Sequence, residues 1–402
     1  MNTQGSARDI VFLSGVRTPF GTFGGTLKDL SAIELAAQAA SCALARAHVE
    51  PDEIGDVIFG NALQTSADAI YYARHVALKA GCPIETPALT VNRLCGSGFQ
   101  SIVSGAQDII MGETETALVG GGESMSQAPH VARGLRWGVP LGKAPVLEDL
   151  LWESLKDPMC GFTMAETAEN LAEKYHLDRT AVDQLALRSQ ETARDAWANG
   201  VFDDEVIGIP VKNPKTRQVE EFKRDEHMRP NTTMDALTKL KPYFKADGVV
   251  TAGNASGIGD GAAALVISSA EFAKKKKLKP LGRLISWGIA GVEPKYMGIG
   301  PVPSSKRALE RAGLTLDDMD LIEVNEAFAP QCVAVERELG IPREKLNIHG
   351  GAIALSHPLA ASGARITAHL LHALRAGGKR YGLGTACIGG GQGIAVVVEA
   401  YS

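Results

Sequence analysis

A faint internal repeat constrains the fold of this chain more than any other feature of its sequence. Residues 43–47, Ala-Leu-Ala-Arg-Ala, match residues 308–312, Ala-Leu-Glu-Arg-Ala. After a shift of one residue the match continues with Asp56, Ile58 and Asn61 against Asp320, Ile322 and Asn325. In each copy an alanine-rich helical stretch leads through a turn into an apolar strand, which is typical of an α/β layer. The repeat indicates a duplicated domain, with chance similarity of two helix-turn-strand units as the alternative.

A long polar segment separates the two copies. Residues 123–248 are rich in loops and proline, with a helical stretch around residues 165–199 and few strand runs. Inserted segments of this size are usually functional, and we expect this one to lie over the first half. The sequence therefore predicts an α/β protein in three parts: a first half of residues 1–122 and 249–273, an inserted loop domain of residues 123–248, and a second half of residues 274–402.

Composition and charge exclude several classes of function. The chain has 402 residues, of which 45% are hydrophobic and 22% charged, and a formal net charge of -5. An acidic body does not attract phosphate backbones or anionic lipids, so we expect no nucleic-acid or membrane partner, and an anionic ligand must meet local basic groups. The six cysteines are dispersed, without a Cys-x-x-Cys pair or a His-Glu-x-x-His motif, so we expect neither a metal site nor a disulfide framework.

Targeting signals are not expected either. Residues 1–15 lack the apolar core of a secretory signal, and no apolar run in the chain reaches membrane-spanning length. The last residues, 398–402, carry no peroxisomal address. The predicted compartment is the cytoplasm.

Two distant cysteines each lie in a glycine-rich turn. Cys95 is followed by Gly-Ser-Gly and Cys387 by Ile-Gly-Gly-Gly, so we expect both sulfurs to be accessible to a substrate. Cys95 lies between a predicted strand, residues 88–92, and a predicted helix. A helix N-terminus favours the thiolate and lowers the pKa of a cysteine toward neutrality, which suits a nucleophile. Cys387 lies in a predicted hairpin turn, which suits a thiol that moves protons. An inert small hydrophobic side chain is the alternative for each.

A base and an amide accompany the two thiols. His357 precedes Pro358 and a predicted helix, whose dipole disfavours the imidazolium and keeps the ring able to accept a thiol proton. Asn325 ends the strand of the second repeat copy and is followed by Glu326. Its amide can hold a water or orient a ring, and the alternative is a helix N-cap.

These blocks resemble the four signature blocks of the thiolases, in family order. They comprise residues 92–98, residues 325–327, His357-Pro358 and residues 387–389. The resemblance covers essentially the whole chain, and four further segments bring it nearest to the mitochondrial type of 3-ketoacyl-CoA thiolase: residues 68–71, 74–76, 124–129 and 297–301. It implies a thiolase-like duplicated five-layered α/β/α/β/α architecture with an inserted loop domain, and a homodimer or homotetramer.

The resemblance also implies an acyltransferase of fatty acid β-oxidation, which uses CoA to cleave a 3-ketoacyl-CoA into acetyl-CoA and a shortened acyl-CoA. Cys95 would be the nucleophile that carries the acyl thioester, His357 the base and an oxyanion donor, and Cys387 the acid/base. Asn325 would hold a water for the thioester oxygen, and the backbone N–H groups of Cys95 and Gly389 would bind the acyl oxygen. CoA is implied as a substrate, with no permanently bound cofactor.

Residues 227–233 resemble the segment of the family that contacts CoA. By this resemblance Arg229 and Thr232 meet the nucleotide and Ser256 meets the pantetheine. A biosynthetic acetoacetyl-CoA thiolase and a CoA-binding protein with impaired catalysis are the alternatives. A decarboxylating condensing enzyme would be expected to carry a second histidine in place of Cys387. A nucleotide site at residues 257–262 is disfavoured because that glycine motif opens onto a predicted strand.

Three residues beside the base depart from the family pattern. His349 stands in the block where the family usually has Asn-Gly-Gly, Ser356 replaces the glycine of Gly-His-Pro, and Ala360 replaces the glycine after Pro-Leu. If those glycines have positive φ or lie close to substrate, each replacement costs about 1 kcal/mol or more and displaces His357. His349 is also a candidate titrating group, with a solvated or hydrogen-bonded loop residue as the alternative.

Overall fold

The strands form one continuous sheet system with two parts. The computed structural model describes residues 9–213 and 216–401, so the first eight residues of the segment expected to lack a secretory signal, and Ser402, lie outside it. The first part has the strand order β1 (Ile10–Arg17), β12 (Gly259–Ser269), β5 (Thr116–Ser124), β3 (Asp56–Gly60) and β4 (Ala88–Val91), with the short β2 (Gly21–Thr22) beside β12. The second has the order β14 (Leu321–Val324), β15 (Tyr381–Ile388), β16 (Gln392–Ala400) and β13 (Gly282–Gly291). A short antiparallel pairing of β1 with β13 joins the two parts.

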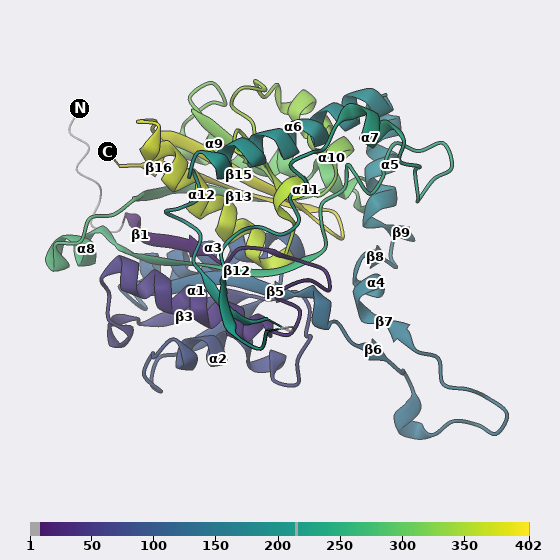
Figure 1. Ribbon diagram of the computed structural model, residues 1–402. Helices are drawn as coiled ribbons and strands as arrows, with labels where there is room; N and C mark the ends of the chain where they lie inside the picture. The colour runs from purple at the N-terminus through teal and green to yellow at the C-terminus, as the bar shows by residue number, and fades with distance from the viewer. Residues whose placement is uncertain (1–8, 214–215, 402) are drawn as a thin grey trace.

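Helices complete a stack of five layers, α/β/α/β/α (Figure 1). The middle layer holds α3 (Ser97–Met111) and α12 (Ser362–Ala376). The outer layer on the first sheet holds α1 (Ala32–Ala47) and α2 (Tyr72–Lys79), and the outer layer on the second holds α9 (Pro301–Ala312) and α10 (Ala329–Leu339). The duplicated five-layered α/β fold predicted from the sequence is confirmed.

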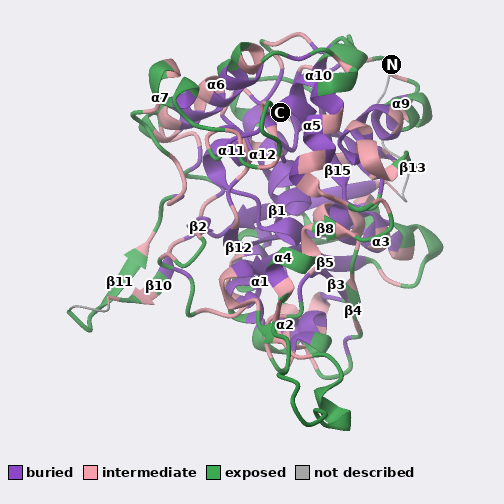
Figure 2. Ribbon diagram, turned by 90° about the vertical axis from the view of Figure 1, so that its right-hand side faces the viewer, coloured by how far each residue is buried: buried purple, intermediate pink, exposed green. Residues whose placement is uncertain are grey.

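The strand sequences explain why the sheets are covered on both faces. β5 and β12 are buried at every position, as expected for strands with helices on each side. Alternate side chains of β12 join different cores: Ala264 and Val266 pack toward α1, whereas Leu265 and Ile267 pack in the middle layer. Figure 2 shows the buried residues running through β1, β12 and α12, with exposed residues on β11 (Val219–Phe222) and α7 (Met234–Thr238).

The two repeat copies occupy equivalent places in the two halves. Residues 43–47 end α1 and residues 308–312 end α9, and each helix closes on a left-handed residue, His48 at φ 53° and Gly313 at φ 64°. The strands that follow, β3 and β14, each pair in parallel with a neighbour. The repeat therefore corresponds to a repeated helix-turn-strand unit.

The inserted segment packs differently from our expectation. Its main helices are α5 (Met164–Lys174) and α6 (Arg179–Ala198), with a short α4 (Leu150–Ser154) and the two-stranded hairpins β6 (His130–Val131) with β7 (Glu148–Asp149), β8 (Lys156–Asp157) with β9 (Phe162–Thr163), and β10 (Ile209–Lys212) with β11. Leu171 and Leu185 share a hydrophobic core with Ile322 and Val333 of the second half. The expectation that the segment lies over the first half is therefore wrong for α5 and α6, because their apolar faces complete the outer layer of the other half.

The predicted limits of the three parts stay predictions. β5 extends through Ser124, so it continues two residues into the predicted insertion. The helix α8 (Ala270–Lys276) spans the predicted junction between residues 273 and 274. Among residues 9–213 and 216–401, no helix has both the length and the apolar character needed to cross a membrane.

Candidate active site

Cys95 lies in the turn that joins the edge strand β4 to the middle helix α3. Residues 94–96 form a 3₁₀ turn directly before the first residue of α3. Asn92 holds this turn: its Oδ1 accepts from the Leu94 N–H at 2.9 Å, and its Nδ2 donates to the Ala62 carbonyl at 3.2 Å. The backbone N–H of Gly389 donates to the Cys95 sulfur, which brings the fourth signature block onto the first.

The thiol of Cys95 is not the activated thiolate expected from its sequence position. Burial raises its pKa to about 11, and this outweighs the effect of the Gly389 N–H. The expected lowering by the helix N-terminus is therefore wrong for the free protein, because desolvation of the sulfur dominates. Cys95 rests as a thiol and requires a base.

Cys387 is the residue before the last of β15, which is followed by the hairpin turn into β16. The hairpin agrees with the prediction, but the expected accessibility of this sulfur is wrong, because Cys387 is fully buried. It packs with Met297 and Ala327, with Met164 beside them. Burial, and then the neighbouring Cys95, raises the pKa of Cys387. This thiol is therefore a proton donor at neutral pH.

His357 is buried and held in one tautomer. Its Nδ1 lies 2.6 Å from Ser362 Oγ, which itself donates to the Pro358 carbonyl at 3.1 Å. Because the hydroxyl proton is used there, Oγ accepts the Nδ1–H, and Nε2 is left as the acceptor. Asn325 Nδ2 lies 3.3 Å from this Nε2.

The ring of His357 is neutral, as expected, but the cause differs. Burial, with Arg365 as the second cause, lowers its pKa to about 3. The helix α12 begins only at Ser362, after the 3₁₀ turn η7 (Leu359–Ala361), so Pro358 does not lie in its first turn. Desolvation of the imidazole, and not a helix dipole, therefore keeps His357 neutral.

Asn325 follows β14 and does not cap a helix. The cap residue of the next helix, α10, is Phe328. Asn325 is fully buried, and its Oδ1 has no hydrogen-bond partner among the described residues. A buried orphan acceptor of this kind is satisfied when a water or a substrate donor occupies the space beside it.

A small apolar cavity of about 170 Å³ opens onto His357. Its other walls are mainly apolar and come from the insertion, from residues 255–258, from the residue before α10 and from the η7 turn: Met125, Trp152, Leu155, Thr163, Met164, Ala165, Phe244, Ala255, Ser256, Gly257, Ile258, Phe328 and Leu359. Cys95 packs against the cluster that contains Met125 and Leu359, and Met164 packs against the cluster that contains Cys387. The wall of the cavity that opens onto His357 therefore shares residues with the surroundings of both thiols.

A second cavity of about 500 Å³ lies beside the first and contains Arg229 and Thr232. The Arg229 N–H donates to Gln190 Oε1 at 2.8 Å, and Thr232 Oγ1 donates to the Arg229 carbonyl at 2.8 Å. Ala252 and Gly253 line this cavity, while Ser256 lines the smaller one, so a single segment forms a wall of both. Of the residues assigned to CoA, Arg229 and Thr232 thus line one cavity, and Ser256 lines the cavity that opens onto His357.

Of the three departures from the family pattern, only Ser356 has strained backbone. Its φ of 88° and ψ of 167° belong to a region that essentially only glycine adopts. Its hydroxyl donates to the Gly257 carbonyl at 3.0 Å, the same carbonyl that accepts the His357 N–H at 2.9 Å. The Ser356 hydroxyl therefore supports the wall of the cavity, whereas the Ser356 backbone, directly before the base, is strained.

This geometry predicts an inverted order of stability for two variants of Ser356. Both Ser356→Ala and Ser356→Gly lose the bond to Gly257, but only glycine releases the strain of about 1–3 kcal/mol. We expect Ser356→Gly to be more stable than Ser356→Ala by about 1 kcal/mol or more, although alanine is normally the better choice. Urea unfolding of the two variants measures the difference, and a more stable alanine variant would contradict the assigned strain.

The other two departures carry no left-handed backbone. Positive φ occurs at Asn347 and Gly350 but not at His349, and Ala360 lies in η7 with its N–H donating to Glu123 Oε2 at 3.1 Å. The expected strain at His349 and Ala360 is therefore wrong. His349 Nδ1 lies 3.1 Å from His369 Nε2, and burial lowers the pKa of His349 to about 4, so it is the hydrogen-bonded loop residue of the alternative interpretation.

Sequence reasoning missed two residues of the site. Ser362 fixes the tautomer of His357 from five residues along the chain, and a hydroxyl one turn after the histidine was the available signal. Glu123 is a fully buried carboxylate at the end of β5, and an acidic residue closing an apolar strand was the signal there.

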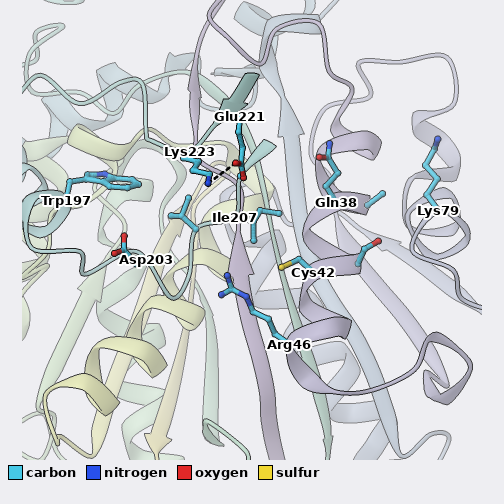
Figure 3. Close-up of a pocket in the computed structure, with 13 residues that line it drawn as sticks. Gln38, Cys42, Arg46, Lys79, Trp197, Asp203, Ile207, Glu221 and Lys223 are labelled. Atoms are coloured by element: carbon cyan, nitrogen blue, oxygen red, sulfur yellow. Dashed lines mark ion pairs between the residues drawn. The ribbon is translucent and has the colours of Figure 1, made fainter. Parts of the chain in front are cut away.

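A larger hollow lies elsewhere on the molecule. A groove of about 880 Å³ runs between α1, α2, α6 and β11, where Cys42, Arg46, Lys79 and Trp197 lie (Figure 3). Glu221 and Lys223 pair at 2.7 Å on its β11 side. It contains none of the predicted site residues. Among the residues that the structure describes, no cluster of three or more His, Cys, Asp or Glu side chains is arranged to hold a metal.

Comparison with known proteins gives the class of the chain. The model of the thiolase N-terminal domain matches residues 10–271, and that of the thiolase C-terminal domain matches residues 278–400. The chain belongs to the thiolase family, and the resemblance noted in its sequence is confirmed. It is an acyltransferase of the thiolase type.

Several of the relatives carry the name of a 3-ketoacyl-CoA thiolase or a β-ketothiolase. The chain is 54% identical to human mitochondrial 3-ketoacyl-CoA thiolase over 98% of each chain, and 50% identical to the β-ketothiolase BktB of Cupriavidus necator over 98% of this chain and 99% of the relative. The crystal structure of the human mitochondrial enzyme matches with a TM-score of 0.97 at 52% identity, covering 99% of this chain and 100% of that one. A structure of the human enzyme in complex with CoA matches with a TM-score of 0.95 at 53% identity, over 98% of each chain.

Proposed function

We propose that this chain cleaves 3-ketoacyl-CoA with CoA, giving acetyl-CoA and an acyl-CoA shortened by two carbons, as part of fatty acid β-oxidation. The observations that carry the proposal are two thiols close enough that Cys95 raises the pKa of Cys387, the Gly389 N–H that acts on Cys95, and the neutral His357 in a cavity whose wall residues pack around both thiols. An acceptor nitrogen, a nucleophile and a proton donor are the three groups that a cleavage by way of an acyl thioester requires.

In the first step the Cys95 sulfur forms a bond to the 3-keto carbon while His357 Nε2 takes the thiol proton. Burial opposes both separated charges, since it raises the pKa of Cys95 to about 11 and lowers that of His357 to about 3. Proton transfer and attack on the carbon must therefore be coupled, so that the negative charge moves onto the carbonyl oxygen. The N–H groups of Cys95 and Gly389 stabilise that oxygen, as oxyanion donors do.

In the second step the bond between the 2- and 3-carbons breaks. The acyl group stays on Cys95, and the leaving enolate of acetyl-CoA takes a proton from Cys387. The raised pKa of Cys387 supports this role, because the thiol keeps its proton until a strong base forms beside it. The thioester oxygen of the enolate is stabilised by protonated His357 and by a water held at Asn325 Oδ1, the buried acceptor without a partner among the described residues.

In the third step CoA removes the acyl group. The Cys387 thiolate takes the proton of the CoA thiol, and the CoA sulfur attacks the thioester carbon. Cys95 leaves as a thiolate and recovers the proton held by His357. The enzyme then returns to its starting protonation state, with one carbon–carbon bond and the S–H bond of CoA replaced by a carbon–sulfur and a carbon–hydrogen bond.

CoA would lie along the two neighbouring cavities. Arg229 at the mouth of the larger one supplies the positive charge that an acidic protein needs for a phosphate group, and Thr232 lies beside it. Ser256 lies on the wall between there and His357, where the pantetheine would pass. The structure of the human relative in complex with CoA supports CoA as the ligand.

We further propose that the chain forms a homodimer or homotetramer in the cytoplasm. β4 is an unpaired edge of the sheet, and exposed apolar side chains lie near it, with Ile84 74% and Leu89 51% exposed. The loop that joins β6 to β7 also exposes Trp137 and Leu141. All six cysteines are free, which fits a reducing compartment. Light scattering after gel filtration measures the oligomer, and microscopy of a tagged chain would reveal a mitochondrial location if this proposal is wrong.

Mass spectrometry of Cys95 tests the function. After incubation with a 3-ketoacyl-CoA, we expect an acyl adduct on the peptide that contains Cys95 and its discharge on addition of CoA. An unmodified thiol would overturn the proposal and favour the CoA-binding protein without catalysis. Kinetics with acetoacetyl-CoA beside longer esters separates a degradative from a biosynthetic enzyme, since a preference for acetoacetyl-CoA would favour the latter.

A further inference from the structure

Glu123 is a buried carboxylate for which the proposed steps have no use. It lies near the end of β5, and its carboxylate is the acceptor in each of its hydrogen bonds. Oε1 accepts from Asn61 Nδ2 and from the Leu63 N–H, both at 2.8 Å. The Ala62 N–H lies 3.2 Å from both oxygens, and the Ala360 N–H donates to Oε2 at 3.1 Å. A ring of donors fits an ionised carboxylate, which can only accept.

These donors come from both halves of the molecule. Asn61, Ala62 and Leu63 directly follow β3 of the first half. Ala360 belongs to the second half and lies three residues after His357. Glu123 therefore ties the loop of the base to the first half, which carries Cys95.

The residues around the Glu123 carboxylate also lie around Cys95. The cluster against which Cys95 packs consists of Leu63, Met125, Leu151 and Leu359. Three of these four are within two residues of Glu123 or of one of its donors. The Ala62 carbonyl also accepts from Asn92, which in turn holds the Leu94 N–H. A continuous path of hydrogen bonds thus runs from the carboxylate to the residue before the nucleophile.

The pKa shifts agree with a short distance between the Glu123 carboxylate and the Cys95 sulfur. Glu123 is one of the groups that raise the pKa of Cys95. Burial raises the pKa of Glu123 itself to about 7, while the N–H groups of Leu63, Ala360 and Ala62 oppose that rise. The cost of burying this carboxylate is therefore met by backbone donors of the two loops that meet at the site.

We propose that Glu123 is a positioning residue of the thiolase reaction, whose carboxylate fixes the His357 loop against the Cys95 turn so that the imidazole can take the thiol proton. The inference rests on the proposed function and adds to it a residue that touches no reacting atom. Its loss would slow acylation of Cys95 and leave CoA binding intact, because Arg229 and Thr232 lie in the other cavity.

The test is Glu123→Gln, which keeps the shape but sets an NH₂ group against N–H donors. We expect kcat to fall at least tenfold, with kcat/KM for CoA within twofold of the wild type, because CoA reacts only with the acyl-enzyme. Asp320→Asn is the matched control, since Asp320 also accepts backbone N–H groups, from Arg380 at 2.9 Å and Tyr381 at 3.0 Å, but lies at the far end of β14. Its kcat should stay within twofold. Circular dichroism confirms that each variant is folded.

A folded Glu123→Gln with unchanged kcat, or with kcat/KM for CoA falling as much as kcat, would overturn the inference. If that variant does not fold, Glu123→Asp decides: the charge remains but the oxygens move back by one methylene, so kcat should fall at least threefold at constant kcat/KM for CoA, and an unchanged kcat would overturn the inference. The comparison uses a wild type that forms the acyl adduct on Cys95. A wild type without that adduct would instead refute the proposed function.

Discussion

Replacing Cys95 with alanine is expected to abolish turnover, with kcat lowered by about 10⁴-fold or more. The sulfur is the atom that would form the acyl thioester, and the neighbouring thiol, Cys387, is fully buried at the end of β15 with a pKa raised by burial and by Cys95. A thiol without exposed surface is a poor substitute nucleophile, because a substrate carbon cannot reach it. We therefore expect no rescue of the first step by Cys387.

The loss should be confined to chemistry. Alanine removes one sulfur from a turn held by backbone groups and by Asn92, so folding and CoA binding should change little. Cys42→Ala is the control, because Cys42 is also partly exposed and lies on α1 beside the large groove, away from His357. Assays of thiolysis with both variants decide the matter. Retention of more than about one hundredth of the wild-type kcat in Cys95→Ala would refute the assigned nucleophile.

The sequence predicted the fold because its signals are local. The alanine-rich ends of α1 and α9 and the strands that follow them differ from their surroundings within a dozen residues, and both helices even close on a left-handed residue at matching positions. The hairpin after Cys387 was also predictable, since its glycines follow one another directly and two of them have positive φ. Turn and helix signals of this kind need no knowledge of the partner surface.

The environment of the two thiols was not predictable in the same way. Glycine after a cysteine suggested clearance for a substrate, yet a Cβ on Gly96 would meet Ile388 and one on Gly389 would meet Leu94 and Met164. The space left by the absent glycine side chains is filled by neighbouring side chains of the protein, so it is not evidence of room for a substrate. Desolvation then controls the pKa of Cys95, and desolvation depends on residues hundreds of positions away.

The packing of the insertion was hidden for a related reason. The apolar stripes of α5 and α6 indicate that each helix buries one face, but Leu171 or Leu185 carries no information about which half receives it. The polar contacts of the insertion with the first half involve residues that read as ordinary charges in the sequence. Arg17, at the end of β1, is the clearest case.

Replacing Arg17 with methionine is expected to lower the free energy of unfolding by about 3–5 kcal/mol. The guanidinium is fully buried, with Nε 2.7 Å from Glu205 and its two terminal nitrogens 2.7 and 2.9 Å from Asp225. Burial alone would lower its pKa, but the two carboxylates outweigh burial and raise it. Methionine fills similar space between the rings of Phe20 and Phe202 and leaves both carboxylates without this cation.

The effect should depend on pH with a definite sign. Burial would raise the pKa of Glu205, but His369 and then Arg17 outweigh it and hold that pKa below its usual value. Stabilisation by this pair is therefore fully present above the unfolded pKa of about 4.3 and is lost as the pH falls toward the folded pKa. Urea unfolding from pH 7 to about pH 2 should show a constant difference between the wild type and the variant down to about pH 4, and a shrinking difference below it. Arg133→Met is the control, since its pair with Glu148 at 2.7 Å is largely exposed to solvent and should contribute little to stability. Equal losses in the two variants, or a difference that does not shrink with acid, would mean that the buried cluster does not anchor the insertion to β1.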